Sequence, residues 1–204
     1  MIGMNKIYTL PNLPYGYKDL EPYMSEGQLK IHHQKHHQAY VNAANALLEK
    51  IEKARTDNTD LDVRAISRDL SFNVGGHVLH SLFWENLAPA DKKSDGQPEG
   101  TVLKKILDNF NSFERFKKEF TQLAITVEGS GWATLLMDQE TNRLFIGQIE
   151  KHNVNLFPNS KIIFALDVFE HSYYIDYKND RAKFVENSWN LINWNEVEKR
   201  IKTM

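Results

Sequence analysis

The stretch LKIHHQKHHQAYVNAANALLEK, Leu29 to Lys50, has the three- and four-residue spacing of apolar positions that is typical of an amphipathic helix, yet it carries four histidines within six positions. Ser25 and Gln28 have capping-box spacing and predict where this helix begins. The stripe expected to face inward comprises Leu29, His32, His36, Tyr40, Ala43, Leu47 and Ile51. Histidine therefore lies on the face that should be buried.

A second helical pattern follows a polar connection at residues 55–60. Its inward stripe comprises Val63, Ile66, Leu70, Asn73, His77, His80, Trp84 and Leu87. The short connection predicts that the two helices run antiparallel as a hairpin. Because His32 and His36 lie four residues apart, they share one helical face, and His77 and His80 lie on the inward face of the partner helix. We therefore expect the facing helices to bring imidazoles together.

Beyond residue 100, helical segments are joined by three strand-like segments, and this pattern predicts an α+β fold. The segment Ala88–Gly100 combines Pro, Gly and charge, which indicates a domain boundary. We expect an N-terminal helical hairpin domain over residues 1–90 and a C-terminal α+β domain over 91–204. The second domain should hold a small three-stranded antiparallel sheet with flanking helices. Helices are expected at 101–110, 112–127, 168–177 and 186–204, and strands at 131–138, 143–150 and 161–167.

Composition narrows the function classes. The 204 residues are 41% hydrophobic and 25% charged, with a net charge of −2 and no block of like charge, so we expect neither a nucleic acid nor a membrane as partner. The first residues lack the apolar core of a signal peptide, which predicts a cytoplasmic protein. The chain has no cysteine, so a metal would be held by nitrogen and oxygen.

The eight histidines fall in four places, 32/33/36/37, 77/80, 152 and 171. A single histidine on an apolar face is usually a hydrogen-bonded core residue, but imidazole is also the commonest metal ligand, and a cation offsets the cost of burying many polar rings. Asp167 ends an apolar strand four residues before His171, so a strand end would deliver a carboxylate and an imidazole together. The alternative for Asp167 is a helix cap.

Nitrogen and oxygen ligands leave more than one metal chemistry open. The chain lacks the His-Glu-x-x-His pattern of zinc hydrolases and the Glu-x-x-His pairs of di-iron bundles. A mixed site with an open position favours iron or manganese redox chemistry, whereas three histidines and a water also suit zinc. A closed structural site without turnover is the remaining alternative.

Five motifs together resemble the iron/manganese superoxide dismutases, in that family's order and spacing. They are HHQKHHQAYVNAAN, GGHVLHSLFWENLAP, GSGWATL, DVFEHSYYIDYKNDR and WNLINW. The resemblance implies an antioxidant oxidoreductase that converts superoxide to dioxygen and hydrogen peroxide, with one iron or manganese ion per chain. It implies His32, His80, Asp167 and His171 as the protein ligands, with solvent as the fifth.

The resemblance also assigns roles around the ligands. It implies that His36 and Tyr40 lie just outside the ligands, with Tyr40 at the substrate funnel and in a hydrogen-bond chain to the metal-bound solvent. It also implies that Trp84 and Trp132 wall the site, and that Lys35 and Arg181 are the cations nearest the entrance. His33, His37 and His77 would be packing or hydrogen-bonded neighbours. It further implies a homodimer or homotetramer in which Glu170 accepts a hydrogen bond from the other chain's His171 and Tyr174 reaches the other chain's His36.

Two positions depart from the usual family pattern. Most members have a glutamine, from either of two places, that hydrogen-bonds the metal-bound solvent. Here Gly76 stands at the first place and His152 at the second, which resembles a variant in some archaeal and bacterial members and leaves the choice between iron and manganese open. Phe169 stands where the family usually has tryptophan, and this loses an indole donor.

Overall fold

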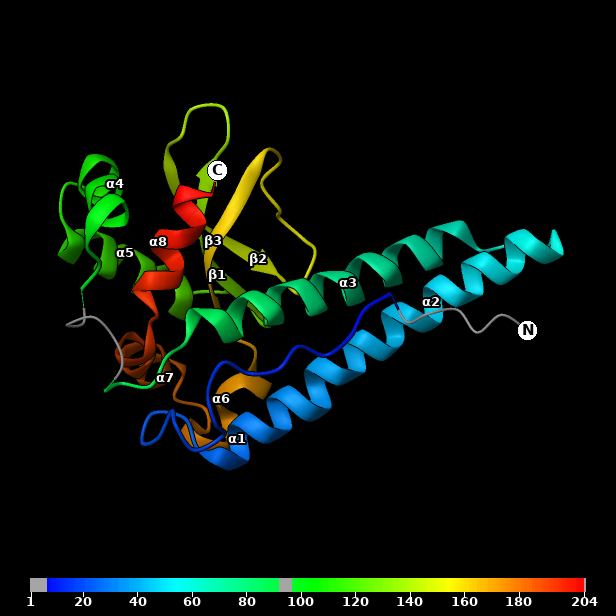
Figure 1. Cartoon of the computed structure of the whole chain (residues 1–204), viewed down its shortest axis with the longest axis horizontal. Helices are drawn as coiled ribbons and strands as arrows, with labels where there is room; N and C mark the ends of the chain where they lie inside the picture. The colour runs from blue at the N-terminus through cyan, green and yellow to red at the C-terminus, as the bar shows by residue number, and fades with distance from the viewer. Residues whose placement is uncertain (1–6, 92–96, 204) are drawn as a thin grey trace.

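The computed structural model describes residues 7–91 and 97–203, and it has a long helical hairpin that projects from a lobe of helices and strands (Figure 1). One arm of the hairpin is a succession of three helical segments, and the other is a single helix that lies beside it. Their bounds are α1 Glu26–Ile31, the π-helix η1 His32–His37, α2 Gln38–Asp57 and α3 Val63–Asn86. Both arms begin at side-chain caps, since Ser25 accepts from the Gln28 backbone N–H and Asp62 from that of Ala65. The expected hairpin is confirmed.

The histidine-rich stretch is not the continuous α-helix that its periodicity predicts, because residues His32–His37 are π-helical. A π-helix bonds residue i to i+5 and so has more residues in each turn, which moves the buried face along the chain. The fully buried side chains of this arm include Leu29, His32, His33, His37, Val41 and Ala44. His36 and Tyr40, expected on the buried stripe, are only half-buried. Two consecutive histidines of the π-helix, 32 and 33, are thus in the interior.

The C-terminal lobe contains the expected three-stranded antiparallel sheet. Its elements are α4 Gly100–Phe110, α5 Phe113–Ile125, β1 Gly131–Asp138, β2 Leu144–Glu150, β3 Ser160–Asp167, α6 Glu170–Tyr177, α7 Arg181–Ser188, the 3₁₀ turn η2 Trp189–Leu191 and α8 Trp194–Lys202. The strand order is β2-β1-β3, so β1 pairs on both sides and is buried almost throughout. Residues 92–96 of the expected domain connection lie outside the described residues. The α+β class is confirmed.

The C-terminal stretch, expected to be one helix over 186–204, is divided into α7, η2 and α8. Ile192 is extended and forms an isolated antiparallel bridge with Leu87, at the end of α3. The next residue, Asn193, donates its backbone N–H to the Asn86 carbonyl at 2.7 Å, and its side chain caps α8. A helix through these residues would lose both contacts, so tertiary pairing overrides the local helical pattern.

A buried arginine ties the hairpin to the sheet. Arg200 of α8 is 6% exposed and donates to the Asn86 side-chain oxygen and, at 3.3 Å, to the Ile163 carbonyl of β3. Asn86 in turn donates to the Ala165 carbonyl of β3 at 2.8 Å. These bonds join α3 and β3, the two elements that carry His80 and Asp167. A guanidinium is suited to this position because it offers five donors in a planar fork.

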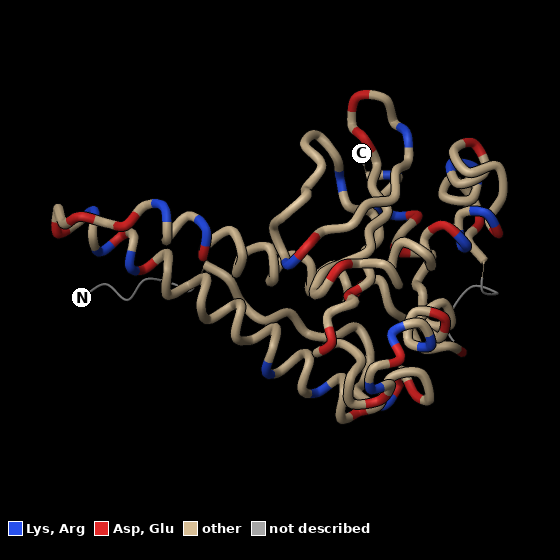
Figure 2. Tube along the Cα trace, turned by 180° about the vertical axis from the view of Figure 1, so that it is seen from behind, with Lys and Arg blue, Asp and Glu red and all other residues tan. Residues whose placement is uncertain are grey.

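Acidic and basic residues are mixed at the far end of the hairpin and over the lobe, whereas residues 36–48 and 70–84 of the two arms carry no Asp, Glu, Lys or Arg (Figure 2). Several of them pair at helical spacing, for example Lys53 with Asp57 at 2.6 Å. Such exposed pairs each contribute little to stability. Within residues 7–91 and 97–203, no helix combines the length and the apolar character needed to cross a membrane.

Candidate metal centre

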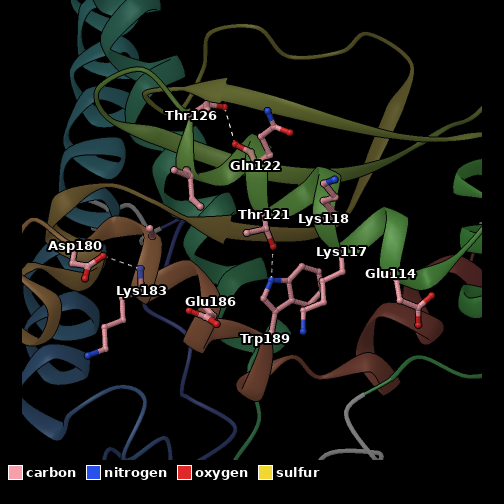
Figure 3. A pocket seen from close by; sticks show the side chains of 12 residues that line it. Glu114, Lys117, Lys118, Thr121, Gln122, Thr126, Asp180, Lys183, Glu186 and Trp189 are labelled. Atoms are coloured by element: carbon pink, nitrogen blue, oxygen red, sulfur yellow. Dashed lines mark hydrogen bonds between the residues drawn. The ribbon is translucent and has the colours of Figure 1, made fainter.

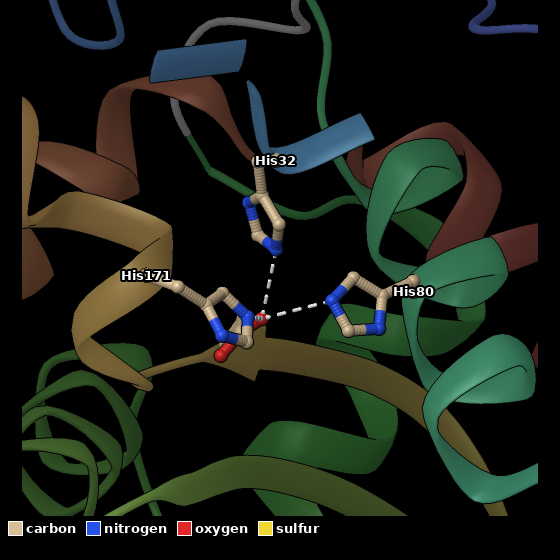
Figure 4. A group of neighbouring side chains, drawn as sticks. His32, His80 and His171 are labelled. Atoms are coloured by element: carbon tan, nitrogen blue, oxygen red, sulfur yellow. Dashed lines mark hydrogen bonds and ion pairs between the residues drawn. The ribbon is translucent and has the colours of Figure 1, made fainter. Parts of the chain in front are cut away.

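Four elements from distant parts of the sequence meet at one buried cluster (Figure 4). The π-helix η1 contributes His32, α3 contributes His80, the last residue of β3 is Asp167, and the first turn of α6 contributes His171. One ligand atom from each of these four residues lies within 4.8 Å of the others. His32, His80 and Asp167 are fully buried. The sequence predicted this set, and the fold brings all four together.

The three imidazoles converge on a single carboxylate oxygen. The Oδ2 atom of Asp167 lies 3.1 Å from Nε2 of His32, 3.2 Å from Nε2 of His171 and 3.5 Å from Nε2 of His80. The other oxygen, Oδ1, accepts the backbone N–H of Phe169 at 2.9 Å. This last bond fixes the carboxylate in orientation, since it holds Oδ1 away from the histidines and leaves Oδ2 facing them.

Burial and neighbouring charge shift the pKa of Asp167 in opposite directions. Burial by itself raises the pKa of the carboxyl, but the charge of His171 and the hydrogen bonds from His171 and His32 outweigh it and hold the pKa far below its usual range. For the histidines burial dominates. It lowers the pKa of His32 to about 4 and that of His80 well below the ordinary value. The centre thus holds an ionised carboxylate beside the neutral imidazoles of His32 and His80.

His80 shows most directly that the cluster suits a cation. Its Nδ1–H donates to the Gly76 carbonyl, one turn earlier on α3, at 2.6 Å. A carbonyl can only accept, so Nδ1 carries the proton and Nε2 carries a lone pair. That Nε2 atom is buried, points toward Asp167 and has no hydrogen-bond partner among the described residues. A neutral imidazole with an unpartnered buried lone pair aimed at a carboxylate is the arrangement of a metal ligand.

The donor set also fits particular ions. Three imidazole nitrogens and one carboxylate oxygen suit first-row transition metals, iron and manganese among them. The buried Nδ1 of His32 likewise lacks a partner within the described residues. A cation between the four side chains would neutralise the Asp167 charge and accept the His80 lone pair. These residues therefore fit the iron or manganese ion that the family resemblance implies.

His152 presents a buried donor beside the cluster. Trp132 donates its indole N–H to Nδ1 of His152 at 3.0 Å, so in the neutral ring the proton is on Nε2. Burial lowers the pKa of His152 to about 4, which keeps the ring neutral near pH 7. Its Nε2 atom is buried without a partner in the described chain. Phe169 stacks on His152, with ring centres 4.5 Å apart and planes at 10°, and so closes one side of the site.

Two adjacent glycines of α3 let His152 and the Tyr40 ring pack directly against this helix. A Cβ on Gly75 would lie 2.3 Å from the backbone oxygen of His152, and one on Gly76 would lie 2.8 Å from Cγ of Tyr40. Any other residue at either position would push His152 or the Tyr40 ring away from α3. Gly76, which the sequence identified only as a missing glutamine, is therefore required by the packing of Tyr40.

Tyr40 and His36 lie at the edge of the cluster. The Tyr40 ring packs against His152 and His80, with centres 4.7 Å and 5.2 Å apart. Burial, followed by the charge of Asp167, raises the pKa of Tyr40, so the phenol stays protonated. Its hydroxyl makes no hydrogen bond to another described residue, so the hydrogen-bond chain expected at Tyr40 is not made by protein groups alone. His36 stacks on His171 at 4.5 Å.

The remaining histidines are hydrogen-bonded, as the sequence predicted, but they are not equivalent. His33 donates to the Pro11 carbonyl and accepts from the Tyr17 hydroxyl, both at 2.8 Å. His37 accepts from the indole N–H of Trp84 and donates to His77, both at 2.9 Å. The sequence did not single out His37. The available signal was the seven-residue spacing of His77 and Trp84, which places both on one face of α3 near His80.

The residues expected near the entrance are on the surface or half-buried. Lys35 is exposed on η1 and forms no ion pair with any described acidic side chain. Arg181, at the start of α7, donates to the Gly129 carbonyl at 2.6 Å and the Val127 carbonyl at 2.5 Å, and to the Tyr173 hydroxyl at 3.3 Å. Arg181 therefore has a structural role that the sequence did not predict.

The residues expected to meet a second chain are exposed. Glu170, in the first turn of α6, has no ion-pair or hydrogen-bond partner among the described residues. Tyr174 and Ile175 on the same helix are 46% and 44% exposed. Helical geometry directs adjacent side chains about 100° apart, and Glu170 forms no bond with its neighbour His171.

A surface groove lies away from the metal centre. A groove of about 930 Å³ between α5 and α7 is lined by Lys117, Lys183 and Trp189, among others (Figure 3). Trp189 donates its indole N–H to Thr121 at 2.9 Å within this groove. None of the groove's lining residues is a histidine, so the groove is separate from the metal centre.

Both parts of the sequence match a known family. Residues 7–88 match the alpha-hairpin domain, and residues 98–200 the C-terminal domain, of iron/manganese superoxide dismutases. The iron superoxide dismutase of Methanothermobacter thermautotrophicus is 57% identical over 197 residues, which cover 97% of this chain and 96% of the relative. That of Pyrobaculum aerophilum is 52% identical, with 97% and 93% covered. The manganese/iron enzyme of Aeropyrum pernix is 51% identical, with 97% and 92% covered. The chain belongs to the iron/manganese superoxide dismutase family.

Proposed function

We propose that this chain converts two superoxide ions and two protons into dioxygen and hydrogen peroxide at a mononuclear iron or manganese site formed by His32, His80, Asp167 and His171. The observation that carries the proposal is the buried lone pair of His80 Nε2, which faces the Asp167 carboxylate without a hydrogen-bond partner in the described chain. Family membership supports the same reaction. When bound, the ion supplies one-electron redox chemistry by alternating between its +3 and +2 states.

The side chains around the ligands then have separate tasks. Trp84 and Trp132, fully buried, wall the site and exclude water. His152 offers its Nε2–H as a hydrogen-bond donor to a small molecule in the site. Tyr40, with its raised pKa, keeps a hydroxyl proton that it can donate as hydrogen peroxide forms. These two donors supply the polar contacts, and His36 extends them toward the surface.

The test of the reaction is a superoxide disproportionation assay on protein loaded separately with iron and with manganese. Elemental analysis of the same samples gives the ion content per chain, and metal-free protein is the control. Activity proportional to bound iron or manganese supports the proposal. A protein that binds only zinc, or that binds iron or manganese without turnover, contradicts it.

The ligand assignment predicts a contrast between two buried histidines. His80→Ala should lose most of the bound metal and of the activity, because it removes one of four donors from a closed site. His33→Ala should be far milder, since His33 bonds to Pro11 and Tyr17 and not to the cluster. Metal content and activity of both variants check this. Equal losses in the two variants would show that the ligand set is wrong.

We propose that positive charge at the surface guides superoxide, an anion, to the site, with Lys35 and Arg181 nearest the entrance. The rate should therefore fall as salt rises toward ~0.5 M, where the Debye length is well below ~8 Å. Lys35→Gln should lower the low-salt rate and flatten this dependence. The control is Lys50→Gln, an exposed position 15 residues away, about 22 Å along the same arm. A salt-independent rate, or equal effects of the two variants, would contradict electrostatic guidance of superoxide by Lys35.

The position of His152 predicts an effect on metal preference rather than on metal binding. Its ring lies 5.6 Å from that of His80 and its buried Nε2 has no partner in the described chain, but it is not one of the four ligands. His152→Gln replaces an imidazole donor with an amide and should change the ratio of iron-supported to manganese-supported activity, while both ions are retained. The measurement is the activity ratio at matched metal content. An unchanged ratio would show that His152 does not tune the ion.

We propose that the chain forms a homodimer, or a homotetramer built from it, in which Glu170 accepts a hydrogen bond from His171 of the second copy. Glu170 is exposed and unbonded in its own chain, and a metal-ligating histidine usually donates its second N–H to a carboxylate or carbonyl. A two-fold axis makes this contact reciprocal. Tyr174 would reach His36 of the second copy in the same way.

Glu170→Ala should therefore weaken the dimer and lower metal retention together. Size-exclusion chromatography at micromolar protein, with metal analysis of the same fractions, checks both effects. Glu186→Ala, which removes the same charge from an exposed position of α7, is the control and should change neither. An intact and fully metallated Glu170→Ala dimer would contradict the bridge.

We also propose that the two domains divide at residues 1–90 and 91–204. In this division the first domain supplies His32 and His80, and the second supplies Asp167 and His171. The metal site would then span the domain boundary, so that binding an ion joins the two halves of the chain. The cytoplasmic location stays a prediction.

A further inference from the structure

His37 lies behind the proposed ligands. It contacts one of them, His80, and also Trp84, which walls the site. It is fully buried in the π-helix. Its ring stacks on that of His80, with centres 5.3 Å apart and planes at 26°. Its Nδ1 accepts from the indole of Trp84, and the Trp84 ring meets His32 edge to face at 4.8 Å. His37 is therefore linked to one proposed ligand by stacking and to another through Trp84.

The hydrogen bonds of His37 define a single ring orientation. An indole N–H can only donate, so Nδ1 of His37 must carry a lone pair. The proton is then on Nε2, which donates to Nδ1 of His77 on α3. Moving the proton from Nε2 to Nδ1 would place a donor against the Trp84 donor and leave His77 without its hydrogen, and turning the ring over would replace both nitrogens by carbon atoms. Both α3 partners thus hold the ring in one state.

We propose that His37 is a positioning residue of the metal centre, which fixes the rings of Trp84 and His80 so that His32 and His80 keep their Nε2 atoms turned toward Asp167. The inference rests on the proposed metal ligands. It assigns His37 a task beyond joining the two arms of the hairpin, because its contacts lead to the ligands themselves. Loss of its hydrogen bonds should loosen the bound ion.

His33 provides a matched control in the same π-helix. It is also buried, also accepts one hydrogen bond and donates another, and its ring also touches Trp84, at 5.6 Å. Its hydrogen bonds lead to Tyr17 and Pro11, in the extended segment before α1, and its ring stacks on none of the four proposed ligands. A purely structural role predicts similar effects for the two positions.

The first experiment compares His37→Phe with His33→Phe in metal-loaded protein. Phenylalanine keeps a ring of similar size but removes the acceptor and the donor. The readout is the rate at which bound manganese passes to an excess of EDTA. His37→Phe should speed this transfer by about 10- to 100-fold, the usual effect of losing a group that orients a metal ligand. His33→Phe should leave it unchanged, although both variants should lower the thermal stability of the metal-free protein.

A double-variant cycle tests whether His37 acts through Trp84. Trp84→Phe removes the indole donor, and His37→Phe/Trp84→Phe should release manganese no faster than His37→Phe alone, because both changes break one linkage. The corresponding control pair is His33→Phe with Tyr17→Phe. If His37→Phe does not fold, His37→Gln, whose amide supplies one acceptor and one donor, takes its place, and it should release manganese more slowly than His37→Ala.

The inference is overturned if His37→Phe and His33→Phe release manganese at equal rates. It is also overturned if the effects of His37→Phe and Trp84→Phe on the release rate are strictly additive. Equal release rates from His37→Gln and His37→Ala would overturn it as well. A failure of the ligand assignment has a different signature. In that case the wild-type chain binds neither iron nor manganese, or His80→Ala retains the ion. Normal wild-type binding with an unaltered His37→Phe release rate would refute only the role of His37.

Discussion

The fold of this protein is arranged around one buried carboxylate. Asp167 is fully buried and ionised, and the only polar atoms that face its Oδ2 in the described cluster are three imidazole nitrogens. Neutral imidazoles relieve such a charge only partly, whereas a cation held by all four side chains neutralises it. Each element that contributes a ligand must therefore end or turn at a defined point. β3 must stop at Asp167, α6 must begin directly after it, and α3 and the π-helix must lie across that end of the sheet.

Several contacts outside the cluster maintain this convergence. Arg200 and Asn86 join α3 to β3, so they set the relation between His80 and Asp167. The paired glycines of α3 let His152 and Tyr40 approach the helix more closely than any side chain would allow. The π-helix carries His32 and His33, which are both buried, and His32 is one of the four clustered side chains. π-helical turns inside α-helices are frequently found at functional sites.

A common device orients the buried rings. The proton position of each is set by a partner that can only donate or only accept, which is the Gly76 carbonyl for His80, the Trp132 indole for His152, the Trp84 indole for His37 and the Pro11 carbonyl for His33. A ring that has one such partner has a defined second nitrogen. In His80 that nitrogen is a lone pair suited to a metal, and in His152 it is a donor suited to hydrogen-bonding a molecule in the site. The two rings thus have opposite tasks although both are neutral and buried.

The sequence by itself determined the fold class, the helical hairpin and the three strands, because these depend on periodicity, on caps such as Ser25 and on the placement of polar residues at the ends of apolar segments. The four candidate ligands came from the resemblance of its motifs to those of a known family, whereas periodicity alone indicated only a wider group of facing histidines. The sequence also determined that nitrogen and oxygen would hold the metal, since the chain has no cysteine. Only the tertiary structure decided the π-helical turn, the break at Ile192 and Asn193, and the separate roles of His33 and His37. Each of these depends on contacts between residues far apart in the chain, such as Trp84 with His37 or Asn86 with Asn193. Local patterns do not contain that information, because two histidines at equivalent spacing become different only through the partners that folding brings to them.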